Sequence, residues 1–150
     1  MDENHKKIAE EVYQMATFIL VESGRDAPLF VLIKDNESIP IIIPPGIEID
    51  LPYYATISLK LAKEQDADAM MVVGGMWVVS DHIDNIDLQT RPSESDKREH
   101  YLNLVYITKD GKTLESIAGK VETDIAGMMY VKEQDWMDTI QHFSLLQPWQ

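Results

Sequence analysis

The residues best suited to chemistry are concentrated between positions 81 and 100. Carboxylates there could hold a hard cation, imidazoles could exchange protons near neutral pH, and guanidinium groups could clamp an anion. A long polar loop in a compact domain commonly carries function, so we expect any site to lie in this stretch. The candidates are Asp81, His82, Asp84, Asp87, Arg91, Glu94, Arg98 and His100.

The three aspartates form the candidate metal site. Asp81, Asp84 and Asp87 are spaced by three residues, so a helical turn would place them on one side, where they could bind Mg²⁺. The segment lacks the glycine and the closing glutamate of an EF-hand loop. Solvated loop carboxylates are the simpler explanation of the same spacing, and we therefore expect no bound cofactor.

The histidines and arginines form the candidate binding set. His82 and His100 lie at the two ends of the loop and could meet across its neck, although two solvent-facing histidines are the simpler alternative. Arg91 and Arg98 bracket Glu94 and could clamp an anion, unless the acids between them neutralise both charges. The chain has no His-Glu-x-x-His pattern, phosphate loop or nucleophile elbow. We therefore predict no catalytic residue.

Two predicted strands hold this loop at its ends. In residues 69–79 both alternating sets of side chains are apolar, which predicts a central strand covered on both faces. Residues 101–108 form a second strand pattern directly after the loop. We expect the two strands to be neighbours in one sheet, with the loop projecting from their ends.

The remaining patterns predict an α+β fold in the order α-β-β-α-β-β-β-α. We expect one domain over residues 1–150, with a mixed, mostly antiparallel sheet of about five strands and three helices. The connection through the second helix is long enough for a crossover, which allows one parallel strand pair. Helices are predicted at 3–22, 50–65 and 133–143, and strands at 28–34, 39–43, 69–79, 101–108 and 113–122, with a further short strand at 127–131.

Turn and stop residues mark several of these boundaries. Ser23-Gly24 is a good helix stop, and Asp110-Gly111 predicts a hairpin between the strands on either side. Pro40 has no backbone donor, which predicts an edge position for the strand at 39–43. The C-terminal residues 145–149 are expected to pack back on the body.

Composition limits the classes of function. The chain has 150 residues, 45% of them hydrophobic, and no cysteine, which excludes disulfides, thiolate catalysis and Cys-ligated metals. Its 26 acidic and 13 basic residues give a formal net charge of -13, which opposes direct binding to nucleic acid or to anionic membranes. We found no apolar run of membrane-spanning length and no leader-like N-terminus, so the expected location is the cytoplasm.

Part of the chain resembles a known group of proteins. The strand with Trp77, the long loop, the segment Arg91–Glu99 and the following strand and Asp-Gly hairpin resemble a loose group of small uncharacterised bacterial and phage proteins. The resemblance covers Trp77 to about Gly111. It supports the strand-loop-strand interpretation, and it implies no activity.

Three functional hypotheses follow from these residues. The first is a non-enzymatic binding or assembly module that forms a homo-oligomer or binds a protein partner. The second is a small metal-dependent hydrolase that uses the 81–100 loop, and the third is an acidic mimic of DNA. We favour the first because no catalytic set converges in the sequence.

Overall fold

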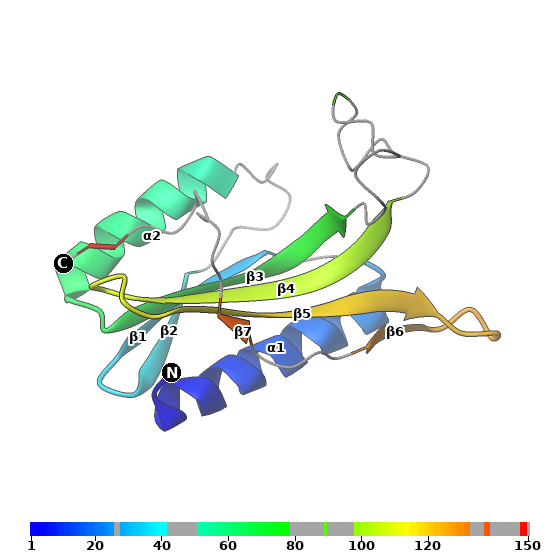
Figure 1. The fold of residues 1–150 in the computed structure, drawn as a ribbon, viewed down its shortest axis with the longest axis horizontal. Coiled ribbons are helices and arrows are strands. Elements are labelled where there is room, and N and C mark those ends of the chain that lie inside the picture. The colour runs from blue at the N-terminus through cyan, green and yellow to red at the C-terminus, as the bar shows by residue number, and fades with distance from the viewer. Residues whose placement is uncertain are drawn as a thin grey trace.

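The computed structural model describes residues 1–25, 28–41, 51–78, 89, 98–132, 137–138 and 148–149. The described strands form one sheet in the order β2-β1-β3-β4-β5-β6, and β7 pairs with β5. The two helices lie on opposite faces of this sheet, which gives three layers (Figure 1). The elements are α1 (Glu3–Ser23), β1 (Leu29–Lys34), β2 (Glu37–Ile41), α2 (Leu51–Gln65), β3 (Ala69–Val78), β4 (Glu99–Thr108), β5 (Leu114–Thr123), β6 (Met129–Lys132) and β7 (Met137–Asp138).

The α+β class is confirmed, and the element count and the sheet type need correction. The described residues contain seven strands and two helices instead of five and three. Every strand pair among them is antiparallel, so the sheet is not mixed. The crossover through α2 does join two strands of the same direction, β2 and β3. They cannot pair because β1 lies between them and is antiparallel to both.

The last predicted helix, at 133–143, is wrong at the two of its residues that the structure describes. Met137 and Asp138 form β7, which pairs antiparallel with Ser116 and Glu115 of β5. β6 pairs with residues 120–123 of β5, and β7 pairs with Glu115 and Ser116 in the earlier part of the same strand. β7 thus supplies partners to backbone groups of β5 that β6 does not reach. The other residues of the predicted helix lie outside the described part of the chain.

α1 begins and ends with capping interactions. The Asp2 carboxylate accepts hydrogen bonds from the backbone N–H groups of Asn4 and His5, at 2.9 and 3.2 Å. At the other end Gly24 adopts φ 70°, and its N–H donates to the carbonyl of Leu20 at 2.8 Å. This left-handed cap confirms the predicted stop, because a residue without Cβ adopts that conformation at little cost.

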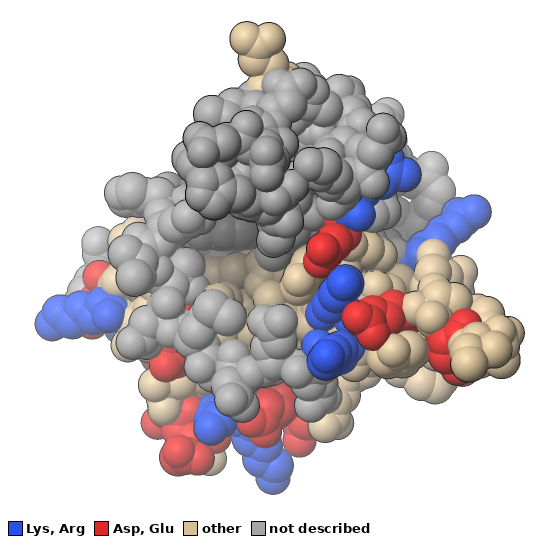
Figure 2. Space-filling model, turned by 45° about the vertical axis from the view of Figure 1, so that its right-hand side comes forward, with Lys and Arg blue, Asp and Glu red and all other residues tan. Residues whose placement is uncertain are grey.

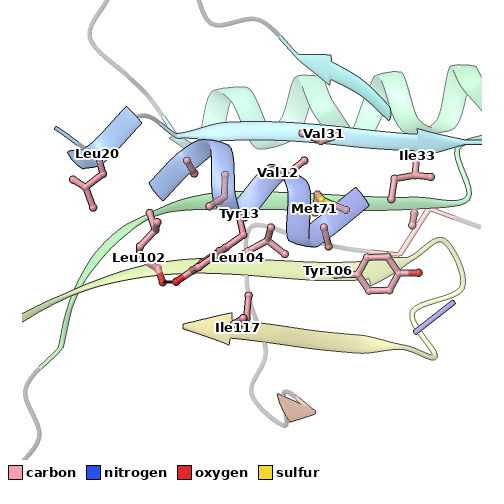
Figure 3. Close-up of a cluster of buried hydrophobic side chains, with 14 residues drawn as sticks. Val12, Tyr13, Leu20, Val31, Ile33, Met71, Leu102, Leu104, Tyr106 and Ile117 are labelled. Atoms are coloured by element: carbon pink, nitrogen blue, oxygen red, sulfur yellow. Dashed lines mark hydrogen bonds between the residues drawn. The ribbon is translucent and has the colours of Figure 1, made fainter. Parts of the chain in front are cut away.

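One face of α1 packs on the sheet and forms the first core. Figure 3 shows its side chains directed at β1, β3, β4 and β5. Tyr13 crosses toward β4, where its hydroxyl donates to the Leu102 carbonyl at 2.9 Å. Gly119 of β5 is buried beside the Tyr13 hydroxyl. This close approach requires glycine, because any side chain at position 119 would collide with Tyr13. The labelled core residues are Val12, Tyr13, Leu20, Val31, Ile33, Met71, Leu102, Leu104, Tyr106 and Ile117.

The β1–β2 hairpin forms one edge of the sheet. Asp35 and Asn36 have φ values of 51° and 62°, the positive values that a two-residue type I′ turn requires. Such a turn makes Lys34–Glu37 a hydrogen-bonded pair, so alternation points the backbone nitrogen of Pro40 away from β1. The missing donor therefore costs no bond within the sheet, and the predicted edge position of this strand is confirmed.

β3 is the interior strand that the sequence predicts. It lies between β1 and β4, and residues 69–73 are at most 7% exposed. β4 pairs with it along its whole length, from Ala69 opposite Thr108 to Val78 opposite Glu99. The segment between Val78 and Glu99 therefore starts and finishes at the same end of the sheet.

α2 and the C-terminal residues cover the opposite face and form the second core. Trp149 is 7% exposed; its ring N–H donates to the Ala67 carbonyl and its backbone N–H to that of Lys109, both at 3.0 Å. The predicted return of the C-terminal residues to the body is thus confirmed at Trp149. The Asp110-Gly111 turn lies directly below, with Gly111 at φ 73°, and joins β4 and β5 as predicted.

Candidate functional site

Part of the α2 side of the sheet carries polar side chains. Side chains alternate along β4, so Val105 lies in the second core while Asn103, Tyr101 and Glu99 follow on the same side toward the start of the strand. By register β3 contributes Gly74 beside Asn103, and β5 contributes Ala118 and Lys120. We call this surface, Gly74, Glu99, Tyr101, Asn103, Ala118, Lys120 and Glu122, the open face.

Charged side chains of the open face form a cross-strand network. Lys120 lies opposite Tyr101, and its ammonium is 3.4 Å from a carboxylate oxygen of Glu99 and 3.7 Å from one of Glu122. The Tyr101 hydroxyl donates to Glu99 at 3.3 Å, and the Tyr130 hydroxyl of β6 donates to Glu122 at 2.7 Å. These contacts restrict the rotamers of side chains that would otherwise move freely. Figure 2 shows acidic and basic side chains alternating along one side of the molecule.

The contacts of this network shift the pKa values of Tyr101, Lys120, Glu122 and Tyr130 away from neutral pH. Partial burial, followed by the charge of Glu99, raises the pKa of Tyr101, and the charge of Glu99 also raises the pKa of Lys120. The hydrogen bond between Tyr130 and Glu122 lowers the pKa of the carboxyl group and raises that of the phenol. At pH 7 the surface therefore presents phenol donors, an ammonium and a carboxylate, each in a fixed protonation state.

Asn103 differs from its charged neighbours because its side-chain amide has no hydrogen bond to any part of the described chain. It is half-buried on a strand with neighbours on both sides. Gly74 and Ala118 flank it in register, and neither has a side chain that extends beyond Cβ. The amide can thus offer one donor and one acceptor, side by side, to a molecule on this face.

The structure describes two of the residues that the sequence proposes as a site. Arg98 is exposed immediately before β4, and His100 is half-buried in β4 opposite Trp77. Side chains alternate along β4, so His100 points to the α1 side of the sheet, whereas Glu99 and Tyr101 point to the α2 side. His100 therefore does not join the polar side chains of the open face. The other candidates, His82, Arg91, Glu94, Asp81, Asp84 and Asp87, lie outside the described residues.

His5 and Tyr106 form a buried polar pair that the sequence interpretation did not identify. His5 Nδ1 is 2.7 Å from the Tyr106 hydroxyl, and the two rings meet edge to face. Burial, helped by nearby carboxylates such as Asp2, raises the pKa of Tyr106 to about 12, so the phenol stays protonated. This contact fastens the first turn of α1 to β4. The sequence did contain a signal for this pair, because His5 lies on the apolar stripe of the helix, where a polar side chain needs a buried partner.

An apolar pocket lies between β2 and α2. It has a volume of about 370 Å³, and its only polar lining side chain among those described is that of Gln65. The described lining of the pocket lacks converging polar groups that would orient a ligand, which distinguishes it from a typical specific small-molecule site. Its lining residues are Leu32, Ile39, Pro40, Ile41, Leu61 and Gln65.

Among the residues that the structure describes, no three histidine, aspartate or glutamate side chains come together as a metal site. Neither described helix combines the length and the apolar character that crossing a membrane demands. Comparison of the chain with protein-family models, with curated proteins and with solved structures finds no match.

Proposed function

We propose that this protein is a non-catalytic binding module that holds a small planar ligand on the open face. The observation that carries the proposal is the unpaired side-chain amide of Asn103, flanked by Gly74 and Ala118. An asparagine amide pairs in two hydrogen bonds with a partner that has an adjacent donor and acceptor, as in its recognition of adenine. The expected ligand therefore carries an amide-like edge.

The electrostatics of the open face favour binding over catalysis. A catalytic acid or base works best with a pKa close to the operating pH. The shifts at Tyr101, Lys120, Glu122 and Tyr130 all lead away from neutrality. Tyr101 and Lys120 then serve as fixed donors beside the amide, which adds directional contacts without proton transfer.

Some of the site residues proposed from the sequence lie next to the open face and are included in this proposal. The segment between Val78 and Glu99 is anchored beside Glu99 and Tyr101, at the polar end of the face. We propose that Arg98, which directly precedes Glu99, contributes to binding at that end. The contributions of His82, Arg91, Glu94 and His100 stay predictions from the sequence.

Nuclear magnetic resonance titration tests the proposed function. Nicotinamide and uracil each carry an amide edge on a planar ring, and nicotinate replaces the amide of nicotinamide by a carboxylate. We expect saturable shifts of the Gly74, Asn103 and Ala118 resonances with at least one amide probe, at dissociation constants of about millimolar for molecules of this size. Nicotinate should bind several-fold more weakly than nicotinamide.

A variant at the central residue provides the control. Asn103→Leu keeps a similar volume and removes both the donor and the acceptor, so it should abolish the shifts while the protein stays folded. No saturable shift with either amide probe, or equal binding by the leucine variant, would overturn the proposal.

A further inference from the structure

Polar groups of the open face other than Asn103 still have hydrogen-bonding capacity. Lys120 and the Tyr101 hydroxyl both contact Oε2 of Glu99, so Oε1 of the same carboxylate has no hydrogen-bond partner in the described chain. The Lys120 ammonium carries three N–H groups, and its two carboxylate contacts leave the third for another acceptor. The side chains of Glu99 and Lys120 are 33% and 37% exposed, so a ligand can reach both.

The register of the strands sets the position of these groups relative to the Asn103 amide. Tyr101 is two residues before Asn103 on the same side of β4, about 6.7 Å away at the usual rise of a strand, and Lys120 lies opposite Tyr101. In the other direction along β4 the next side chain on this side is Val105, which is 2% exposed in the second core. A ligand paired with Asn103 can therefore extend a polar substituent along β4 toward Tyr101 and Lys120, and not toward Val105.

We propose that the ligand of the open face is a nucleoside that carries no phosphate group. This inference rests on the proposed function, in which Asn103 pairs with the amide edge of a planar ring. In uridine the N3–O4 edge offers the adjacent donor and acceptor, and N1, which bears the ribose, lies across the ring from that edge. Pairing of the edge with Asn103 therefore directs the ribose toward Glu99 and Lys120.

A hydroxyl group matches the two unused positions of the charged network. It both donates and accepts, so a ribose hydroxyl can donate to Oε1 of Glu99 and accept from the third N–H of Lys120. Acidic side chains bind ribose hydroxyls in the same way in dinucleotide-binding folds. An ionised phosphate only accepts, and the carboxylates of Glu99 and Glu122 would repel it, since together they already balance the charge of Lys120. The network thus favours a hydroxyl over a phosphate.

Nuclear magnetic resonance titration with uracil, uridine, 2′,3′-dideoxyuridine and uridine 5′-monophosphate tests this inference. We expect uridine to bind about tenfold more tightly than uracil, because its hydroxyl joins a carboxylate and an ammonium through charge-assisted hydrogen bonds. The dideoxynucleoside should lose this gain. The monophosphate should bind more weakly than uridine, and added salt should reduce the difference because it screens the carboxylates. Uridine that binds no more tightly than uracil or the dideoxynucleoside, or no more tightly than the monophosphate, would overturn the inference.

Two matched variants connect the gain to the carboxylate of Glu99. Glu99→Gln keeps the size of the side chain and removes its charge, so the affinity ratio of uridine to uracil should fall several-fold. Glu37→Gln, at an exposed carboxylate on the opposite edge of the sheet, should leave the ratio unchanged. Equal ratios in the two variants would also reject the nucleoside. The proposed function is decided separately, by nicotinamide and uracil with Asn103→Leu, so a bare ring that binds without any gain from ribose rejects this inference alone.

Discussion

Gly119 offers the sharpest test of how α1 is seated on the sheet. A Cβ at this position would lie 2.6 Å from the Tyr13 hydroxyl oxygen and 3.0 Å from the Lys132 carbonyl oxygen, and it would also clash with a methyl group of Val131. The backbone at Lys132 belongs to β6, so it cannot yield without disturbing the ladder with β5. Gly119→Ala must therefore displace Tyr13 and Val131.

The expected cost follows from three effects. Overpacking a well-filled core costs about 1–3 kcal/mol. If the ring of Tyr13 moves, its hydrogen bond to Leu102 is lost, which adds about 1 kcal/mol. Replacing glycine in a strand regains about 0.5–1 kcal/mol of backbone entropy. The net destabilisation is about 2 kcal/mol, or about 4–8 °C in Tm for a chain of this length.

Gly74→Ala is the matched control for this experiment. Gly74 lies in β3, and its added Cβ would meet only Pro28 atoms at 3.9 Å, an ordinary contact distance. This substitution should leave the free energy of unfolding unchanged or raise it by about 0.5–1 kcal/mol. Urea denaturation of both variants gives the comparison.

A double-mutant cycle identifies the source of the cost. In a background of Tyr13→Phe and Val131→Ala, two of the three close atoms are gone, so Gly119→Ala should cost at least about 1 kcal/mol less than in the natural chain. Equal costs in the two backgrounds, or equal effects of the alanines at Gly119 and Gly74, would refute the proposed packing of Tyr13 over β5.

Three further predictions concern the helix cap and two titrating groups. Asp2→Ala removes the side-chain acceptor of the first N–H groups of α1 and should lower the free energy of unfolding by about 1 kcal/mol, whereas Asp2→Asn should retain most of it; thermal denaturation compares the two. Tyr106 has a pKa raised to about 12, so the stability that its neutral phenol contributes should be complete below pH 10 and fall as the pH rises to about 12; spectrophotometric titration of Tyr106→Phe should lack this late ionisation. Hydrogen bonds from the Lys112 N–H and the Thr108 hydroxyl lower the pKa of Asp110 from 3.8, so the advantage of the natural chain over Asp110→Asn should be present at neutral pH and disappear on acidification below that value, as measured by urea denaturation.

Local chemistry in the sequence determined the boundaries and the strand neighbours. Gly24 ended α1 because a left-handed cap favours glycine, and Pro40 was restricted to an edge because it cannot donate. The two-sided apolar pattern of β3 required cover on both faces, and its pairing with β4 followed from their order. These features depend on a few adjacent residues, so they can be inferred without coordinates.

The sequence predicted the candidate site less well than the fold. The sequence placed the expected site in the polar loop because charged residues are concentrated there. The open face depends instead on Asn103, Gly74 and Ala118, which come from three different strands. None of them forms a motif along the chain. Their relation arises only when β3, β4 and β5 are placed in register.

The sequence by itself thus determined the class of the fold, the interior position of β3 and the edge position of β2. Only the tertiary structure decided that β1 separates β2 from β3, that residues 137–138 pair with β5, and that His5 contacts Tyr106. The physical reason is range: caps, turns and side-chain alternation are set by neighbours along the chain. Strand order and buried polar pairs depend instead on which distant groups satisfy one another when the sheet closes.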